Sequence, residues 1–166
     1  MGGALCLGVL LAAACARPPV RVEETIEPIR VSDAVGLGDP ARRASMRLVV
    51  QGLDADEAGE TERAQGSYER AVQVDATNPY VYLALARHHL DGGDSEHATY
   101  LIDQAAALFE AEGMREPRVG VHLIGLRGRA MQLGGQNDEA VLYLERAGVM
   151  APAVWGDAYL SAEELR

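Results

Sequence analysis

Three copies of one short segment decide the fold: GETERA at residues 59–64, GDSEHA at 93–98 and GQNDEA at 135–140. The second copy begins 34 residues after the first, and the third begins 42 residues after the second. Seven residues after the last alanine of each copy comes another alanine, at positions 71, 105 and 147. Similar segments at such spacings predict a chain built from stacked structural repeats of about 20–50 residues.

The residues around each copy favour two helices joined by a tight turn. The leading glycine suits the left-handed backbone with which a helix commonly ends. Asp94 or Ser95 in the second copy and Asn137 in the third can cap the next helix, and Pro79 after Asn78 is typical of a first helical turn. The alanines allow two helices to touch closely. The pattern predicts helices near 42–58, 61–75, 79–91, 95–112, 117–133 and 137–150.

Further positions recur with the copies. Between the paired alanines stand large apolar residues, namely Tyr68, Ile102 and Leu144. Ahead of each copy a large apolar residue precedes a small one by four positions, in the pairs Leu48 and Gly52, Tyr82 and Ala86, and Ile124 and Gly128. From Ser45 to Pro152 the chain therefore resembles the tetratricopeptide repeat, a helix-turn-helix unit of about 34 residues. The resemblance implies an all-α fold, a right-handed α-solenoid of about three helix pairs within residues 44–166.

The residues after Pro152 are expected to close the solenoid. Trp155 follows Pro152 by three positions, as Tyr82 follows Pro79, so a fourth first helix can begin here. Alternatively, Pro152 ends the third repeat. In both cases we expect a C-terminal capping helix with Trp155 as its apolar plug, because the terminal unit of a solenoid must cover its neighbour.

The first residues of the chain predict export. Residues 1–14 contain an eleven-residue apolar run, which is typical of a signal peptide and too short to cross a bilayer as a helix. The run ends in LAAAC, which resembles the lipobox of bacterial lipoproteins and implies that Cys15 carries the lipid. The alternative is an ordinary secretory signal that is cut after Ala14 or Ala16.

Residues 15–43 predict a flexible tether between the lipid and the repeats. They contain four prolines, and neither a helical nor a strand period persists along them. The alternative is a coil or strand that packs on the domain.

The composition excludes several classes of function. The 166 residues carry 15 basic and 25 acidic side chains, a formal net charge of −10, and every basic residue is an arginine. Such an acidic chain lacks the basic surface that binds nucleic acid. The serines stand in no nucleophile motif, and the adjacent His88 and His89 point to different sides of a helix. We therefore expect no catalytic residue, no metal site and no cofactor.

In tetratricopeptide proteins the first helix of each repeat lines a concave groove that receives a peptide. The resemblance places in this groove Met46, Val49, Leu53, Tyr80, Leu83, Arg87, His122, Gly125 and Arg129. Arg87 and Arg129 occupy the same phase of successive first helices, so we expect them to form a basic spot beside the apolar residues. A peptide with an apolar part and an acidic part would match this groove.

Together these features predict a non-catalytic adaptor or assembly factor for another protein of the bacterial cell envelope. We expect a monomer that a lipid on Cys15 anchors in the membrane. The outer membrane, facing the periplasm, is the expected site because alanine and not aspartate follows the cysteine. Two alternatives stay open. One is a structural protein that assembles with itself through exposed repeat ends, and the other is an enzyme of unknown type.

Overall fold

The computed structural model describes residues 25–166, and within this range the secondary structure is helical with no β-strand. The helices are α1 (Val31–Ala34), α2 (Pro40–Glu57), α3 (Thr61–Val74), α4 (Pro79–Asp91), α5 (Ser95–Ala111), α6 (Pro117–Leu133), α7 (Asn137–Met150), α8 (Pro152–Trp155) and α9 (Ala162–Leu165). Among these residues no helix is both long and apolar enough to cross a membrane. The predicted signal peptide and Cys15 lie outside the described range.

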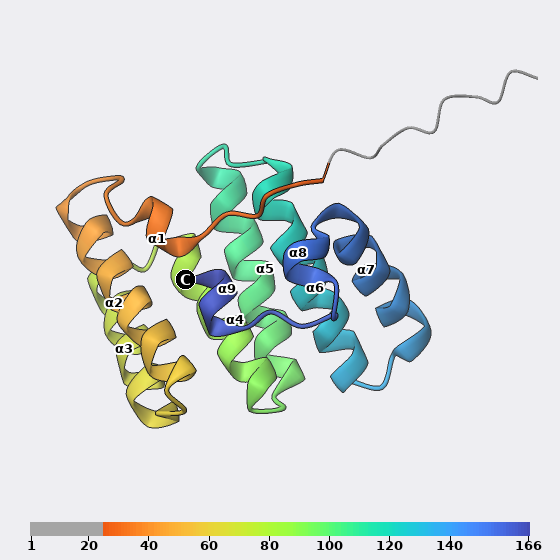
Figure 1. Ribbon diagram of the computed structural model, residues 1–166. Helices are drawn as coiled ribbons and strands as arrows, with labels where there is room; N and C mark the ends of the chain where they lie inside the picture. Colours follow the sequence, from red (N-terminus) through yellow and green to blue (C-terminus); the bar gives the residue numbers. More distant parts are fainter. Residues whose placement is uncertain (1–24) are drawn as a thin grey trace, which may run out of the picture.

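Three pairs of long helices stand side by side (Figure 1). In each pair the second helix packs on the first, so that α2 contacts α3, α4 contacts α5 and α6 contacts α7. The first helices adjoin one another, because α4 contacts both α2 and α6. The prediction of an all-α solenoid with three helix pairs is confirmed. Each long helix begins and ends within two residues of its predicted position.

Local signals explain where the long helices begin and end. The side chains of Asp39, Asn78 and Asp94 accept hydrogen bonds from backbone N–H groups in the first turns of α2, α4 and α5. The glycine that opens each repeated segment has a positive φ angle, of 73°, 81° and 83° at Gly59, Gly93 and Gly135. A left-handed backbone costs an L side chain about 1–2 kcal/mol, so glycine recurs at this turn in every repeat.

Small residues lie where the two helices of a pair touch. A methyl group on Gly52 of α2 would overlap the Tyr68 ring of α3. In the third pair, a methyl group on Gly128 would lie 2.9 Å from Cγ of Leu144. Carbon atoms pack best at about 3.5–4.0 Å, so both positions require the small residue that recurs in the sequence.

The chain on either side of the repeats forms shorter elements. α8 packs on α7, whereas α9 packs on α2 at the other end of the solenoid. The C-terminal residues therefore form two short helices in place of the single capping helix expected from the sequence. Figure 1 shows that the segment leading into α1 and the segment from α8 to α9 cross the same side of the helical array.

Candidate partner-binding site

The face formed by α2, α4 and α6, called the inner face below, carries every residue predicted to line a peptide groove. These residues are Met46, Val49 and Leu53 on α2, Tyr80, Leu83 and Arg87 on α4, and His122, Gly125 and Arg129 on α6. All of them are buried except Arg129, which is half-buried. The expected groove is thus not open along the whole inner face, because other parts of the same chain cover it.

Residues 25–35 form the first cover. Their backbone donates hydrogen bonds to distant carbonyl groups, from Ile26 to Met150 at 2.7 Å, from Ile29 to Arg118 at 3.2 Å and from Ser32 to Arg166 at 2.7 Å. Val31 is fully buried. The tether predicted for residues 15–43 is therefore corrected over residues 25–35, which pack on the domain as in the alternative interpretation, and α2 already begins at Pro40.

The C-terminal residues form the second cover. Trp155 is only 1% exposed, and its ring lies so close to α6 that a methyl group on Gly125 would come within 2.5 Å of ring carbons. Leu165 of α9 is fully buried. The guanidinium group of Arg166 lies 2.6 Å from the carboxylate of Asp54 on α2. The chain thus folds its own end onto the surface that a peptide was expected to occupy.

His122 connects both covers to α6. The indole N–H of Trp155 donates to Nδ1 of His122 at 3.3 Å, and Nε2 of the same ring lies 2.9 Å from the carbonyl oxygen of Ile29. A neutral imidazole with its proton on Nε2 satisfies both contacts. Burial lowers the pKa of His122 to about 4, which keeps the ring neutral near pH 7. His122 therefore connects both covers to α6 and is buried away from any partner.

Arg87 belongs to a buried ion-pair network. Its guanidinium lies 2.6 Å from Asp56 of α2 and 2.7 Å from Asp91 of α4. The Asp56 carboxylate also contacts Nδ1 of His88 at 2.7 Å and accepts a hydrogen bond from the Tyr68 hydroxyl at 2.9 Å. The basic spot expected from Arg87 and Arg129 is therefore wrong, because Arg87 is only 3% exposed and paired with acids.

One end of the predicted groove still borders open space. A cavity of about 420 Å³ lies between the segment before α2, the α3–α4 turn and the end of α5. Met46 and Tyr80 line it together with Ala34, Leu37 and Met114. Its volume lies within the range of about 300–1,000 Å³ that is usual for binding pockets. This space, called the Met46–Tyr80 cavity below, is large enough for apolar side chains of a partner.

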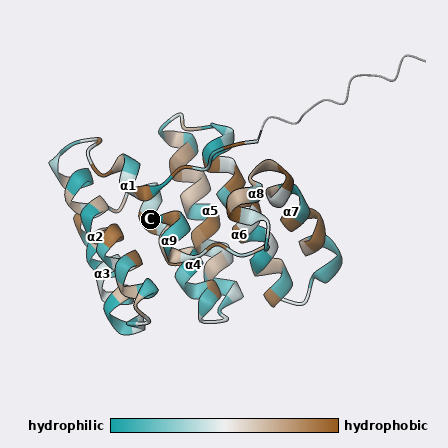
Figure 2. Cartoon of the chain, in the orientation of Figure 1, coloured by the Kyte–Doolittle hydropathy of each residue, from teal (hydrophilic) through white to brown (hydrophobic). Residues whose placement is uncertain are grey.

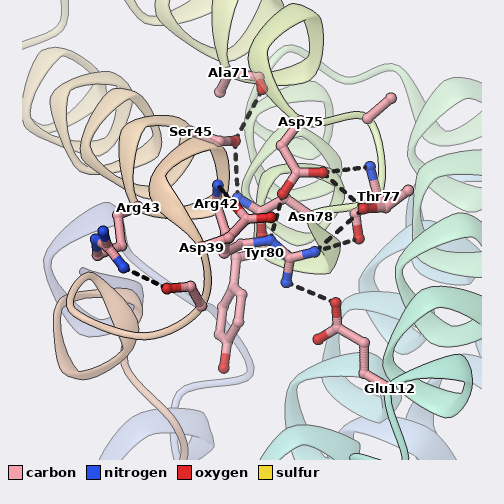
Figure 3. A network of polar contacts seen from close by, with 12 residues as sticks. Asp39, Arg42, Arg43, Ser45, Ala71, Asp75, Thr77, Asn78, Tyr80 and Glu112 are labelled. Carbon is pink, nitrogen blue, oxygen red and sulfur yellow. Dashed lines mark hydrogen bonds and ion pairs between the residues drawn. The ribbon is translucent and has the colours of Figure 1, made fainter.

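Arg42 lies on the polar rim of the Met46–Tyr80 cavity. Figure 3 shows its contacts with neighbouring polar groups. Its guanidinium contacts the carboxylates of Asp75 at 2.5 Å and Glu112 at 2.6 Å. It also donates to the carbonyl oxygen of Thr77 at 3.0 Å. Burial raises the pKa of Asp75, but hydrogen bonds from Arg42 and Thr77 outweigh burial and hold it below its usual range. With Asp39 the rim has three acidic groups and one basic group, a net charge of −2.

A second group of polar side chains meets at the turn between α4 and α5, where the sequence indicated no metal site. One donor atom each from His89, Asp94 and His97 lies within 4.8 Å of the others. The adjacent histidines do point to different sides, since His88 contacts Asp56 and His89 faces Asp94. The signal in the sequence that indicates this cluster is Asp94, three residues before His97 at a helix start.

Comparison with known proteins supports the repeat architecture. No family model matches the chain. Residues of this chain are 33% identical, over 86 positions, to cellulose synthase operon protein C of Pseudomonas fluorescens (strain SBW25). The match covers 46% of this chain, and the chain spans only 6% of that relative.

Among solved structures, the N-terminal domain of stress-induced protein-1 (STI-1) from C. elegans superposes with a TM-score of 0.57 at 17% identity. The superposition covers 67% of this chain and 87% of that domain. Both similar proteins contain tetratricopeptide repeats, a fold that typically serves as a non-catalytic interaction scaffold. The helix pairs of this chain therefore form a tetratricopeptide-type α-solenoid.

Proposed function

We propose that the chain is a non-catalytic adaptor that binds a partner protein of the bacterial cell envelope at the Met46–Tyr80 cavity. The observation that carries the proposal is the cavity itself. It is bordered by two residues of the predicted groove, while residues 25–35 and the residues after α7 cover other parts of the inner face. The solenoid fold supports an interaction role, since proteins with this fold bind protein or peptide partners.

The chemistry of the cavity defines the partner segment. Its apolar wall suits an aliphatic or aromatic side chain, and its rim has a net charge of −2 on a chain of net charge −10. Burying one such side chain contributes about 1.5–3 kcal/mol, less than the roughly 4 kcal/mol of a millimolar complex. Contacts with the rim must therefore add to the affinity. We expect an apolar residue flanked by lysine or arginine, not the acidic peptide expected from the sequence.

We further propose that a lipid on Cys15 anchors the adaptor in the outer membrane, with the repeat domain facing the periplasm. The similarity to a cellulose synthase operon protein supports a bacterial envelope context. Two acyl chains anchor a protein stably, whereas one chain alone is marginal.

The Cys15→Ser variant is expected to move from the membrane fraction of cells to the soluble fraction. The matched control is Cys6→Ser, since Cys6 lies within the predicted signal peptide and its loss should leave membrane recovery unchanged. Fractionation followed by immunoblotting measures both variants. Equal membrane recovery of the two would place the anchor elsewhere.

Two exposed leucines offer a matched test of the cavity. Leu37 lines the cavity and is 64% exposed, whereas Leu142 on α7 is 66% exposed and remote from it. A photo-crosslinking residue is placed at position 37 or at position 142, and the chain is crosslinked in cells. The protein that is captured from position 37 but not from position 142 is then identified. Binding of that purified protein is then measured by calorimetry. Leu37→Glu is expected to weaken binding about 10-fold or more, because it removes apolar packing and places a carboxylate, which must lose water on binding, where the partner's apolar side chain is proposed to lie.

Exposed apolar residues on α7 favour self-assembly as a second candidate function. Val141, Leu142 and Val149 are all exposed there, and Figure 2 shows hydrophobic residues along this helix. The same variants separate the candidates. If Leu142→Glu and not Leu37→Glu reduces binding, or converts an oligomer into a monomer by light scattering, α7 is the interaction surface and the cavity is not.

A further inference from the structure

The turn between α4 and α5 brings together three side chains that can bind a metal ion. Asp94 caps α5, and its Oδ2 lies 2.7 Å from Nδ1 of His97 and 3.6 Å from Nδ1 of His89. The two imidazole rings stack with their centroids 5.4 Å apart. The three donors therefore converge from the last turn of one helix and the first turn of the next.

The two distances from Asp94 fit a small tetrahedral ion, and all three donor atoms lie within 4.8 Å of one another. Zinc binds nitrogen and oxygen ligands at about 2.0–2.2 Å, so two ligand atoms at a tetrahedral angle stand about 3.3 Å apart. The distances from Asp94 to the two histidines, 2.7 and 3.6 Å, lie on either side of that value. The side chain of His97 is 70% exposed, so it has room to turn toward an ion.

We propose that His89, Asp94 and His97 bind one divalent transition-metal ion of the zinc class. Two imidazoles and one carboxylate match the ligand preference of zinc and its neighbours, whereas calcium and magnesium prefer oxygen ligands alone. Three protein ligands leave the fourth position for water.

The backbone of the turn holds the acidic ligand in place. The N–H of His97 donates to Oδ1 of Asp94 at 3.1 Å, which leaves Oδ2 to face both histidines. The N–H of Asp94 donates to the carbonyl oxygen of His89 at 2.8 Å. Because these bonds fix the carboxylate before any ion arrives, little order has to be gained on binding.

Calorimetric titration of the purified, untagged full chain with zinc sulfate tests the site. We expect one zinc ion per chain at these side chains and visible d–d bands of tetrahedral cobalt when cobalt(II) is the probe. Removing an outer partner of a metal ligand commonly costs 10- to 100-fold in affinity. Replacing a ligand itself, by His97→Ala or Asp94→Asn, should therefore weaken zinc binding by about 100-fold or more. Asparagine retains the helix cap, so the second variant keeps the fold.

Glu96→Gln is the matched control, since Glu96 is exposed, adjoins His97 and lies outside the cluster. It should bind zinc like the unaltered chain. If His97→Ala and Glu96→Gln bind zinc equally, or the unaltered chain binds no zinc, the proposal is overturned. Circular dichroism checks that each variant remains helical, and the Asp94→Asn result stands if His97→Ala unfolds.

Discussion

The free energy of unfolding of the Trp155→Ala variant is expected to be about 3–5 kcal/mol lower than that of the unaltered chain. This is the usual cost of replacing a large aromatic residue in a core with alanine. Trp155 is 1% exposed and is the residue that holds the second cover on α6. Its loss also removes the hydrogen bond to His122, which connects both covers. Urea denaturation followed by circular dichroism gives the difference.

Tyr100→Ala is the control for this variant, because Tyr100 is an aromatic residue that lies exposed on α5. Surface substitutions of this kind usually change stability by no more than about 0.5 kcal/mol. Equal losses for the two variants would mean that Trp155 does not fill a site on the inner face.

The free energy of unfolding of the Arg87→Ala variant should fall by a similar amount, because the substitution leaves Asp56 buried without its closest cation. Removing one partner of a buried ion pair typically costs about 3–5 kcal/mol. Arg63→Ala is the control, since Arg63 is exposed and pairs with Glu60 at the surface, where such pairs contribute about 0–1 kcal/mol. Urea denaturation at pH 7 compares the two variants, and a small effect of Arg87→Ala would contradict the buried network.

The same network predicts how this difference depends on pH. Burial raises the pKa of Asp56, but hydrogen bonds from His88 and Arg87 outweigh burial and hold it below the ordinary value of 3.8. A carboxylate with a lowered pKa stabilises the fold fully above that value, and its contribution is lost as the pH falls through the pKa of the folded state. The gap between the unaltered chain and Arg87→Ala should therefore narrow below pH 4.

The helix pairs could be predicted from the sequence because their signals are local. Asp94 caps a helix that begins at the next residue, and Gly93 has the positive φ angle that the turn requires. Pro79 stands in the first turn of α4, as expected. The glycine turn and the proline in the first turn of the first helix recur in every helix pair, so the number of pairs and the approximate ends of the long helices follow from the sequence alone. The predicted cap at Asn137 is wrong, because Asn137 is the first residue of α7 and Gln136 before it makes no side-chain cap.

The covering of the inner face could not be predicted, because it depends on isolated residues that meet distant parts of the chain. Ile29 and Val31 alternate with Arg30 for too short a stretch to establish a strand, yet this segment packs across the repeats. Trp155 packs against Gly125, which lies 30 residues earlier in the chain. The sequence indicates that these residues are apolar but not which surface they cover.

The partners of the charged residues could not be predicted, for the same reason. Arg87 has the phase of a groove residue, but Asp56, 31 residues earlier in the chain, pairs with it inside the fold. Arg42 forms the rim of the Met46–Tyr80 cavity through acids that are 33 and 70 residues away. Helical phase alone does not distinguish an exposed arginine from one that folding pairs with an acid.

Amide hydrogen exchange measured by NMR tests most directly whether the chain covers its own inner face. The amides of Ile26 and Ser32 donate to the carbonyl groups of Met150 and Arg166 and belong to no long helix. We expect them to exchange at least about 100-fold more slowly than in an unstructured peptide, and to lose this protection in Trp155→Ala while the α4 amides stay protected. Exchange in the unaltered chain at the rate of an unstructured peptide would contradict the account, because it would mean that the inner face is open to a partner.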